Sequence, residues 1–267
     1  MSIRLGIAPI AWTNSDLPEL GGDTSLETCL RESREAGFTG TETGVKFPMD
    51  PAVLGPILRE QGLVLVSGWF SGRLREVSVT EEKQRIESQL ATFAALGAPV
   101  LVYAETSDSV QGDRSASLDQ RPHMTPEQFA DYGRKLTELA GHLAERGVQL
   151  SYHPHMGTVV ESEQDIDQLM AHTGPEVGLL IDTGHLHFAG ADILGVTRRH
   201  AERINHIHCK DVRPQVLQQV RDTRMSFLNA VLAGVFTVPG DGCIDFAAFS
   251  QELAAAHYSG WVVVEAE

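Results

Sequence analysis

The sequence has few cysteines and no long hydrophobic run. Its three cysteines, Cys29, Cys209 and Cys243, are odd in number and form no CxxC pair, so no disulfide framework is expected. No apolar stretch reaches the roughly 18 residues that a membrane helix needs. The N-terminus also lacks a basic segment followed by an apolar run, so no signal peptide is expected. We therefore predict a cytoplasmic protein that does not bind a membrane.

Basic residues are also scarce. The chain has 21 Lys and Arg against 36 Asp and Glu, a formal charge of −15 over 267 residues. Such a charge repels the phosphate backbone of nucleic acids, so we expect no nucleic-acid partner. Hydrophobic residues make up 42% and charged residues 21%, which is typical of a globular protein. These values do not determine the oligomeric state, and they are compatible with a homo-oligomer.

Short apolar or β-branched runs alternate with longer segments of helical periodicity. In Thr125 to Arg146, for example, Leu136, Leu139, Ala140 and Leu143 recur with the spacing of a buried helical stripe. Eight runs are predicted as strands: 3–9, 38–43, 63–69, 99–104, 148–153, 177–182, 204–209 and 261–266.

Eight strand–helix units in a chain of this length favour a closed parallel barrel, the (β/α)8 or TIM barrel of the α/β class. The alternative, an open doubly wound sheet, loses support because the sequence contains neither GxGxxG nor GxxxxGK[ST]. We predict a single TIM-barrel domain over residues 1–267. No sequence follows the eighth strand, so the last outer helix is expected to be lacking or supplied otherwise.

Potential metal ligands stand at the ends of the last four predicted strands, in the segments LSYHPHMG, GLLIDTGHLH, INHIHCKDV and WVVVEAE. A single histidine or carboxylate there is most simply a hydrogen-bonded or helix-capping residue. Four strand ends in succession point to a metal site, because active sites of these barrels lie at the carboxyl ends of the strands. Mixed His and carboxylate ligation suits Mn, Co, Fe or Zn better than Ca or Mg.

Several segments resemble one known family. YHPHMGTVVE, LLIDTGHL, NHIHCKDVR, FTVPGDGCIDF and GWVVVEAE, with the opening GIAPIAW and the GTETG segment around Glu42, are similar to the myo-inosose-2 dehydratases of inositol catabolism, within the xylose-isomerase-like isomerase and epimerase superfamily. The resemblance runs nearly end to end. It implies a TIM barrel, a divalent ion such as Mn or Co, and elimination of water from 2-keto-myo-inositol (scyllo-inosose) to give 3D-3,5/4-trihydroxycyclohexane-1,2-dione.

The resemblance also implies a ligand set. Superfamily members hold their metal with Glu, Asp, His and Glu from strands five to eight, and Asp182, His208 and Glu265 match the last three. Where many relatives have Glu-Asn-His, this sequence has His-Pro-His, beginning at His153. Either His153 is the fourth ligand, or water and substrate complete the coordination shell.

Elimination next to a ketone needs a base for the α-proton and an acid for the leaving hydroxyl. Glu265 is a candidate base as well as a ligand; His155, with Lys210 as second choice, is the candidate acid. The expected contacts to the cyclic polyol ketone are Glu42, His185, Trp12, Trp69 and Arg213. Glu42 could instead cap a loop, and the tryptophans could pack in the core. The rival functions are a ketose isomerase or epimerase on the same site and a non-catalytic polyol-binding barrel.

Overall fold

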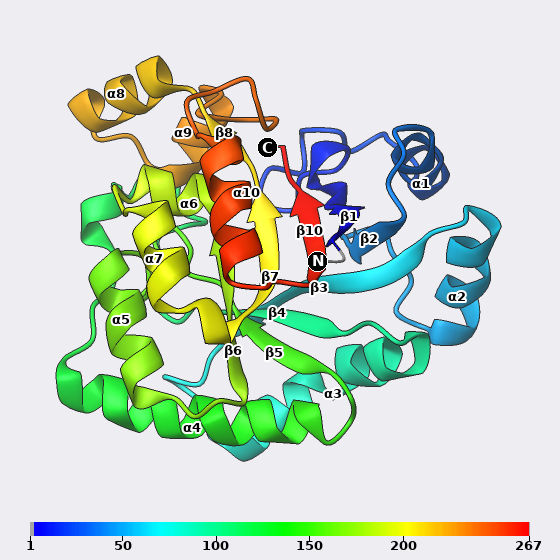
Figure 1. The fold of residues 1–267 in the computed structure, drawn as a ribbon, viewed down its shortest axis with the longest axis horizontal. Helices are drawn as coiled ribbons and strands as arrows, with labels where there is room; N and C mark the ends of the chain where they lie inside the picture. The colour runs from blue at the N-terminus through cyan, green and yellow to red at the C-terminus, as the bar shows by residue number, and fades with distance from the viewer. Residues whose placement is uncertain (1–2, 267) are drawn as a thin grey trace.

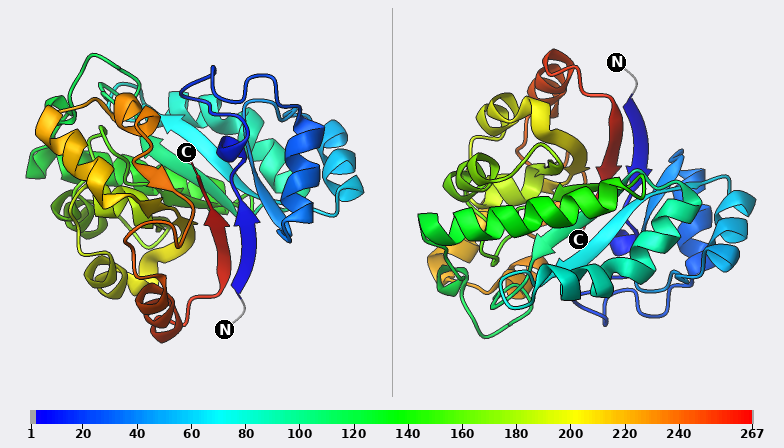
Figure 2. Two further views of the ribbon diagram at one scale, coloured as in Figure 1. Left: turned by 90° about the horizontal axis from the view of Figure 1, so that it is seen from above. Right: turned by 90° about the horizontal axis from the view of Figure 1, so that it is seen from below.

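The strands of the computed structural model, which describes residues 3–266, close into a parallel barrel with the order β1-β10-β7-β6-β5-β4-β3-β2. The pairing of β1 with β10, which closes the ring, places the two strands side by side in Figure 2. The barrel strands are β1 (Ile3–Ile7), β2 (Gly40–Thr43), β3 (Val64–Gly72), β4 (Val100–Glu105), β5 (Gln149–Tyr152), β6 (Val177–Asp182), β7 (Ile204–Cys209) and β10 (Gly260–Val264). The predicted barrel is confirmed, with every strand in or near its expected range.

Helices surround the strands on the outside (Figure 1). They are α1 (Leu26–Glu35), α2 (Pro51–Glu60), α3 (Val79–Leu96), α4 (Pro126–Ala144), α5 (Glu163–His172), α6 (Thr183–Phe188), α7 (Ile193–Arg199), α8 (Pro214–Thr223), α9 (Phe227–Leu232) and α10 (Phe246–Ala255), with short 3-10 turns at Pro9–Ala11, Leu118–Gln120 and Ala201–Arg203. Within residues 3–266, no helix is long and apolar enough to cross a membrane.

Local signals explain where the helices begin and end. Ser78 and Thr125 form capping boxes at the starts of α3 and α4, which satisfies backbone N–H groups that have no partner inside the helix. Gly97 ends α3 in the left-handed conformation, with φ of 71°. Ser25 caps α1 and accepts a hydrogen bond from the backbone N–H of Thr28.

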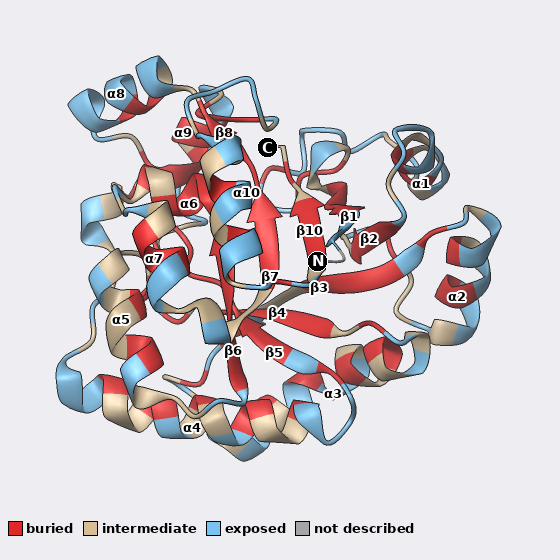
Figure 3. Ribbon diagram, viewed as in Figure 1, coloured by how far each residue is buried: buried red, intermediate tan, exposed pale blue. Residues whose placement is uncertain are grey.

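The main core lies between the barrel wall and the outer helices. The predicted stripe of α4, Leu136, Leu139, Ala140 and Leu143, is fully buried there, and Figure 3 shows buried strands inside a ring of helices with exposed outer faces. Strand β1 is less well covered than the other strands, since its Leu5 is 51% exposed. Within residues 3–266 no helix follows β10.

The segment after β7 contains structure that the sequence analysis did not predict. A two-stranded antiparallel ribbon pairs β8 (Asp211–Val212) with β9 (Phe236–Thr237), and α8 and α9 lie between them in the chain. Together with Phe188, these elements form a second apolar cluster. The ribbon packs over the carboxyl end of the barrel, next to the candidate site, where Phe236 lies against the His185 ring.

Candidate active site

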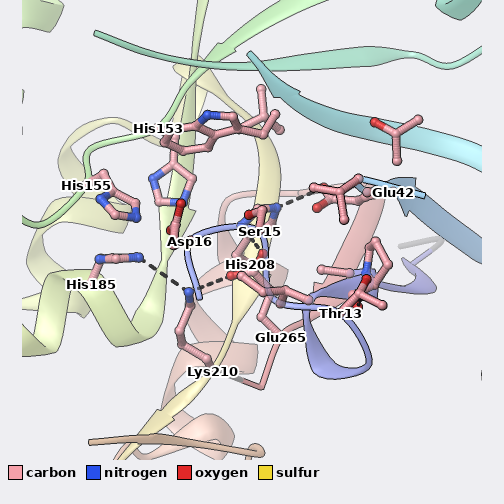
Figure 4. A pocket seen from close by; sticks show the side chains of 18 residues that line it. Thr13, Ser15, Asp16, Glu42, His153, His155, His185, His208, Lys210 and Glu265 are labelled. Carbon is pink, nitrogen blue, oxygen red and sulfur yellow. Dashed lines mark hydrogen bonds and ion pairs between the residues drawn. The ribbon is translucent and has the colours of Figure 1, made fainter. Parts of the chain in front are cut away.

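The carboxyl ends of four neighbouring strands carry the candidate metal ligands. β5, β6, β7 and β10 follow one another around the barrel, and His153, Asp182, His208 and Glu265 lie at or just beyond their ends. Asp182 is level with His208 in the strand register. All four side chains are buried, and Figure 4 shows His153, His208 and Glu265 pointing into one space.

Their ligand atoms are separated by distances that one ion can span. His153 Nε2 lies 3.6 Å and His208 Nδ1 lies 3.7 Å from Asp182 Oδ2. His208 Nδ1 is also 3.3 Å from Glu265 Oε1. Ligands bound about 2.1 Å from one ion stand roughly 3.0–3.4 Å apart in octahedral or tetrahedral geometry. His153, Asp182 and His208 place their ligand atoms within 4.8 Å of one another, and Glu265 adjoins this group through His208.

Two of these atoms have unsatisfied hydrogen-bonding capacity. Asp182 Oδ2 and His208 Nδ1 are buried with no hydrogen-bond partner among the described residues, a costly arrangement in a protein interior. His153 and His208 also have suitable tautomers: Nδ1 of His153 lies 2.7 Å from the carbonyl oxygen of Pro154 and so carries the proton, leaving Nε2 free. In His208 the two nitrogens have the opposite roles: Nε2 donates to Glu42 Oε1 at 2.9 Å, so Nδ1 is the nitrogen that faces the metal site. These residues fit a divalent metal ion.

Lys210 adds a positive charge beside the quartet. Its Nζ lies 2.6 Å from Glu265 Oε2 and 3.4 Å from Asp182 Oδ2. The side chain reaches this buried position because residue 184 is glycine: a Cβ there would come within 2.1 Å of Lys210 Cγ. Helix α6 thus leaves room for the lysine at its first turn.

Charge pairing governs the protonation of the metal-free site. Burial raises the pKa of Asp182, but Lys210 and the surrounding histidines outweigh it and hold the pKa well below its usual range. Glu265 behaves likewise: His208 and Lys210 overcome burial and lower its pKa to about 2. For His208, burial favours the neutral ring, yet Glu265 and Glu42 raise its pKa well above the ordinary value. The metal-free site therefore holds ionised carboxylates around a protonated His208.

His155 is buried among aromatic rings on the other side of the pocket. Trp69, His185 and Phe227 contact it with ring centroids 5.3, 4.0 and 5.0 Å away. Burial, reinforced by the neighbouring His153 and Lys210, lowers the pKa of His155 to about 3. Its Nδ1 lies 2.9 Å from the carbonyl oxygen of Met156, so the neutral ring presents an unprotonated Nε2.

The space between these groups is a pocket with an empty volume, open mouth included, of about 680 Å³. Eight of the predicted site residues line it: Glu42, Trp69, His153, His155, His185, His208, Lys210 and Glu265. A ninth, Asp182, lies behind the wall against His153.

Trp12 and Arg213 lie elsewhere. The Trp12 indole N–H donates to Glu32 Oε2 of α1 at 2.7 Å. The Arg213 guanidinium is held by the ribbon and its turn, where it pairs with Asp241 at 2.9 Å and donates to Thr237 Oγ1 at 2.8 Å. The structure thus gives both residues partners away from the pocket, and Glu267, a further candidate at the last strand end, lies outside the described residues.

The sequence analysis missed one wall of the pocket. Thr13, Ser15 and Asp16, from the loop that follows β1, line it together with the candidate ligands His153, His208 and Glu265 (Figure 4). A signal was available, since this polar TNSD segment follows a predicted strand end as the other site segments do. The sequence analysis also missed the hydrogen-bond network that Ser67 and His206 form with Glu42, next to His208.

Comparison with known proteins defines the family. Residues 30–267 match the model of the xylose isomerase-like TIM barrel, and the chain belongs to this family. Among solved structures, the IolI protein with a bound zinc atom has a TM-score of 0.70 and 19% identity, covering 98% of this chain and 88% of its own. L-ribulose 3-epimerase has a TM-score of 0.68 and 18% identity, covering 100% and 82%. At these identities the likeness concerns the fold.

Curated relatives are more similar. An inosose dehydratase of Geobacillus thermodenitrificans is 46% identical over 99% of this chain and 90% of its own length. An inosose dehydratase of Lacticaseibacillus casei is 43% identical over 100% and 90%. The rhizopine catabolism protein MocC of Rhizobium meliloti is 50% identical over 100% and 82%.

Proposed function

We propose that this protein is a metal-dependent inosose dehydratase of inositol catabolism. It eliminates water from 2-keto-myo-inositol and forms 3D-3,5/4-trihydroxycyclohexane-1,2-dione. The observation that carries the proposal is the placement of His155 and Lys210 in the same pocket as the buried His153, Asp182, His208 and Glu265 quartet. The full-length similarity to inosose dehydratases supports the choice of substrate and reaction.

The quartet would hold the metal ion through two nitrogen and two oxygen ligands. This mixed set suits Mn or Co, with Zn and Fe also compatible. When bound, a divalent cation supplies Lewis-acid stabilisation of the negative charge that develops beside the ketone. His153 takes the place of the glutamate found in many superfamily members, and its free Nε2 supports its assignment as the fourth ligand.

His155 is suited to remove the α-proton. It enters the reaction neutral, with the lone pair of Nε2 unprotonated and Nδ1–H committed to Met156. A neutral imidazole accepts a proton before it can donate one, which makes His155 a base at this step. The sequence analysis preferred His155 as the acid, but burial of this ring among Trp69, His185 and Phe227 favours the opposite order.

Lys210 is suited to protonate the leaving hydroxyl. It lies beside the ionised Asp182 and Glu265, which stabilise its ammonium form. In the proposed reaction, the α-carbon proton passes to His155 Nε2 and the C–H electron pair forms a double bond between the α- and β-carbons. The bond from the β-carbon to its hydroxyl breaks with its electron pair on oxygen, and a Lys210 proton completes the water molecule. The resulting enol then tautomerises to the dione. Exchange with solvent then restores both side chains.

The test is incubation with 2-keto-myo-inositol in deuterated water with Mn or Co, following dione by ultraviolet absorption and deuterium by mass spectrometry. Wild type should form dione. His155→Ala should lose both dione formation and exchange into recovered substrate, whereas Lys210→Met should retain exchange and lose dione. Exchange without dione in wild type would identify an epimerase, and neither reaction would favour a polyol-binding protein.

The same assay tests the ligands. Asp182→Ala, His208→Ala and Glu265→Ala should each abolish turnover while circular dichroism shows the fold intact. Full turnover after exhaustive chelation would contradict the metal mechanism.

We also propose a cytoplasmic location, because the three cysteines are free thiols, as is typical of proteins in reducing compartments. Cell fractionation tests this location.

A further inference from the structure

A buried hydrogen-bond network lies behind the candidate ligand His208, on the side away from the metal quartet. Glu42, at the end of β2, presents Oε1 to three groups at once: His208 Nε2 at 2.9 Å, His206 Nε2 at 2.9 Å and Ser67 Oγ at 2.5 Å. Ser67 Oγ is also 3.0 Å from His206 Nε2. All four side chains are buried, with Ser67 and His206 completely so.

We propose that Glu42 is a positioning residue for the metal site: it selects the tautomer of His208 that can bind the ion. A neutral histidine has one protonated and one unprotonated ring nitrogen. Because Glu42 accepts the Nε2 proton, the nitrogen that loses its proton when His208 becomes neutral is Nδ1, the atom that lies 3.7 Å from Asp182 Oδ2 and 3.3 Å from Glu265 Oε1. A hydrogen-bonded carboxylate behind a ligating histidine also increases the basicity of the ring.

Ser67 and His206 hold Glu42 in the orientation that this task needs. Without them the carboxylate could rotate towards the pocket, which it also lines. The serine hydroxyl and the His206 N–H both donate to the same oxygen that faces His208, so that oxygen is fixed in place. They come from β3 and β7, on either side of the barrel interior, which ties the position of Glu42 to the barrel itself.

A second metal ion is the competing explanation for this cluster, since Glu42, His206 and His208 place their ligand atoms within 4.8 Å of one another. The distances argue for hydrogen bonds. Both histidine nitrogens are 2.9 Å from one carboxylate oxygen, a normal N–H···O separation, and a single oxygen serves all three groups. One ion per chain is therefore expected, on the Nδ1 side of His208.

This inference rests on the metal site of the proposed function but not on the reaction, so metal binding tests it without substrate. Isothermal titration with Mn should give one ion per chain in wild type. Glu42→Gln should weaken binding by about 10- to 100-fold, the usual loss for a partner behind a metal ligand. Ser67→Ala, which leaves Glu42 in place, should weaken it by roughly fivefold, as expected for loss of one hydrogen bond.

The matched control is Glu105→Gln. Glu105 is a buried carboxylate at the end of β4, but it accepts hydrogen bonds from the backbone N–H groups of Ser107 and Arg75. Its substitution should leave Mn affinity unchanged. Wild-type affinity in both Glu42→Gln and Ser67→Ala would overturn the proposal, and so would two ions per chain. If Glu42→Gln does not fold, Ser67→Ala alone decides.

Nitrogen NMR of the zinc-loaded wild type, labelled with 15N at histidine, reads the tautomer directly. We expect His208 to show metal on Nδ1 and a proton on Nε2, and a proton on Nδ1 with metal on Nε2 would refute the assignment. Loss of dione formation with normal metal binding and this tautomer would count against the proposed reaction alone, so the two failures are distinguishable.

Discussion

Metal binding by this protein should release a proton from His208. In the metal-free protein, Glu265 and Glu42 overcome the effect of burial and hold the pKa of His208 well above its ordinary value, so at neutral pH both ring nitrogens carry protons. An ion can bind Nδ1 only after that proton leaves. The proton and the metal therefore compete for one atom.

The magnitude follows from this competition. While His208 is protonated in the metal-free state, each unit of pH changes the apparent metal affinity about tenfold, or roughly 1.4 kcal/mol. Affinity should therefore rise with pH, by about tenfold per unit, throughout the range in which the metal-free His208 is protonated. The sign is fixed by the direction of the shift: a raised pKa means more proton competition, which weakens metal binding as the pH falls.

Isothermal titration of Mn in PIPES, HEPES and TES, buffers that differ in ionisation enthalpy, measures the number of protons released. We expect about one proton per ion at neutral pH. The Glu105→Gln variant should give the same number, because that carboxylate lies outside the network. A count of zero, with affinity independent of pH, would show that His208 is already neutral or is not a ligand.

Three further predictions concern positions around the site and in the core. His153→Ala should lower metal affinity more than turnover at saturating metal, as measured by Mn titration; unchanged affinity would make His153 a substrate contact. Gly184→Ala should displace Lys210, because the new Cβ would overlap its Cγ, and should reduce dione formation while metal binding persists. Leu139→Ala should lower the free energy of unfolding by about 2–5 kcal/mol in urea titrations, since Leu139 is fully buried; a loss below about 1 kcal/mol would contradict its place in the core.

Strand positions were predictable because their signal is local. A buried parallel strand is a short apolar run, and the helix between two strands has its own period, so the eight barrel strands appear in the sequence in order. The ribbon of β8 and β9 was not predicted. Its strands have two residues each, too few to show any period, and they pair across the 23 residues from Arg213 to Val235.

The sequence by itself determined the barrel and the set of strand ends at which His153, Asp182, His208 and Glu265 stand, because parallel strands in a barrel bring their carboxyl ends together. Only the tertiary structure decided how these groups are protonated and supported. The tautomer of His208 depends on Glu42, which is 166 positions away in the chain, and the neutral state of His155 depends on rings from three other elements. Hydrogen bonding and burial are properties of the folded arrangement, so no local pattern encodes them.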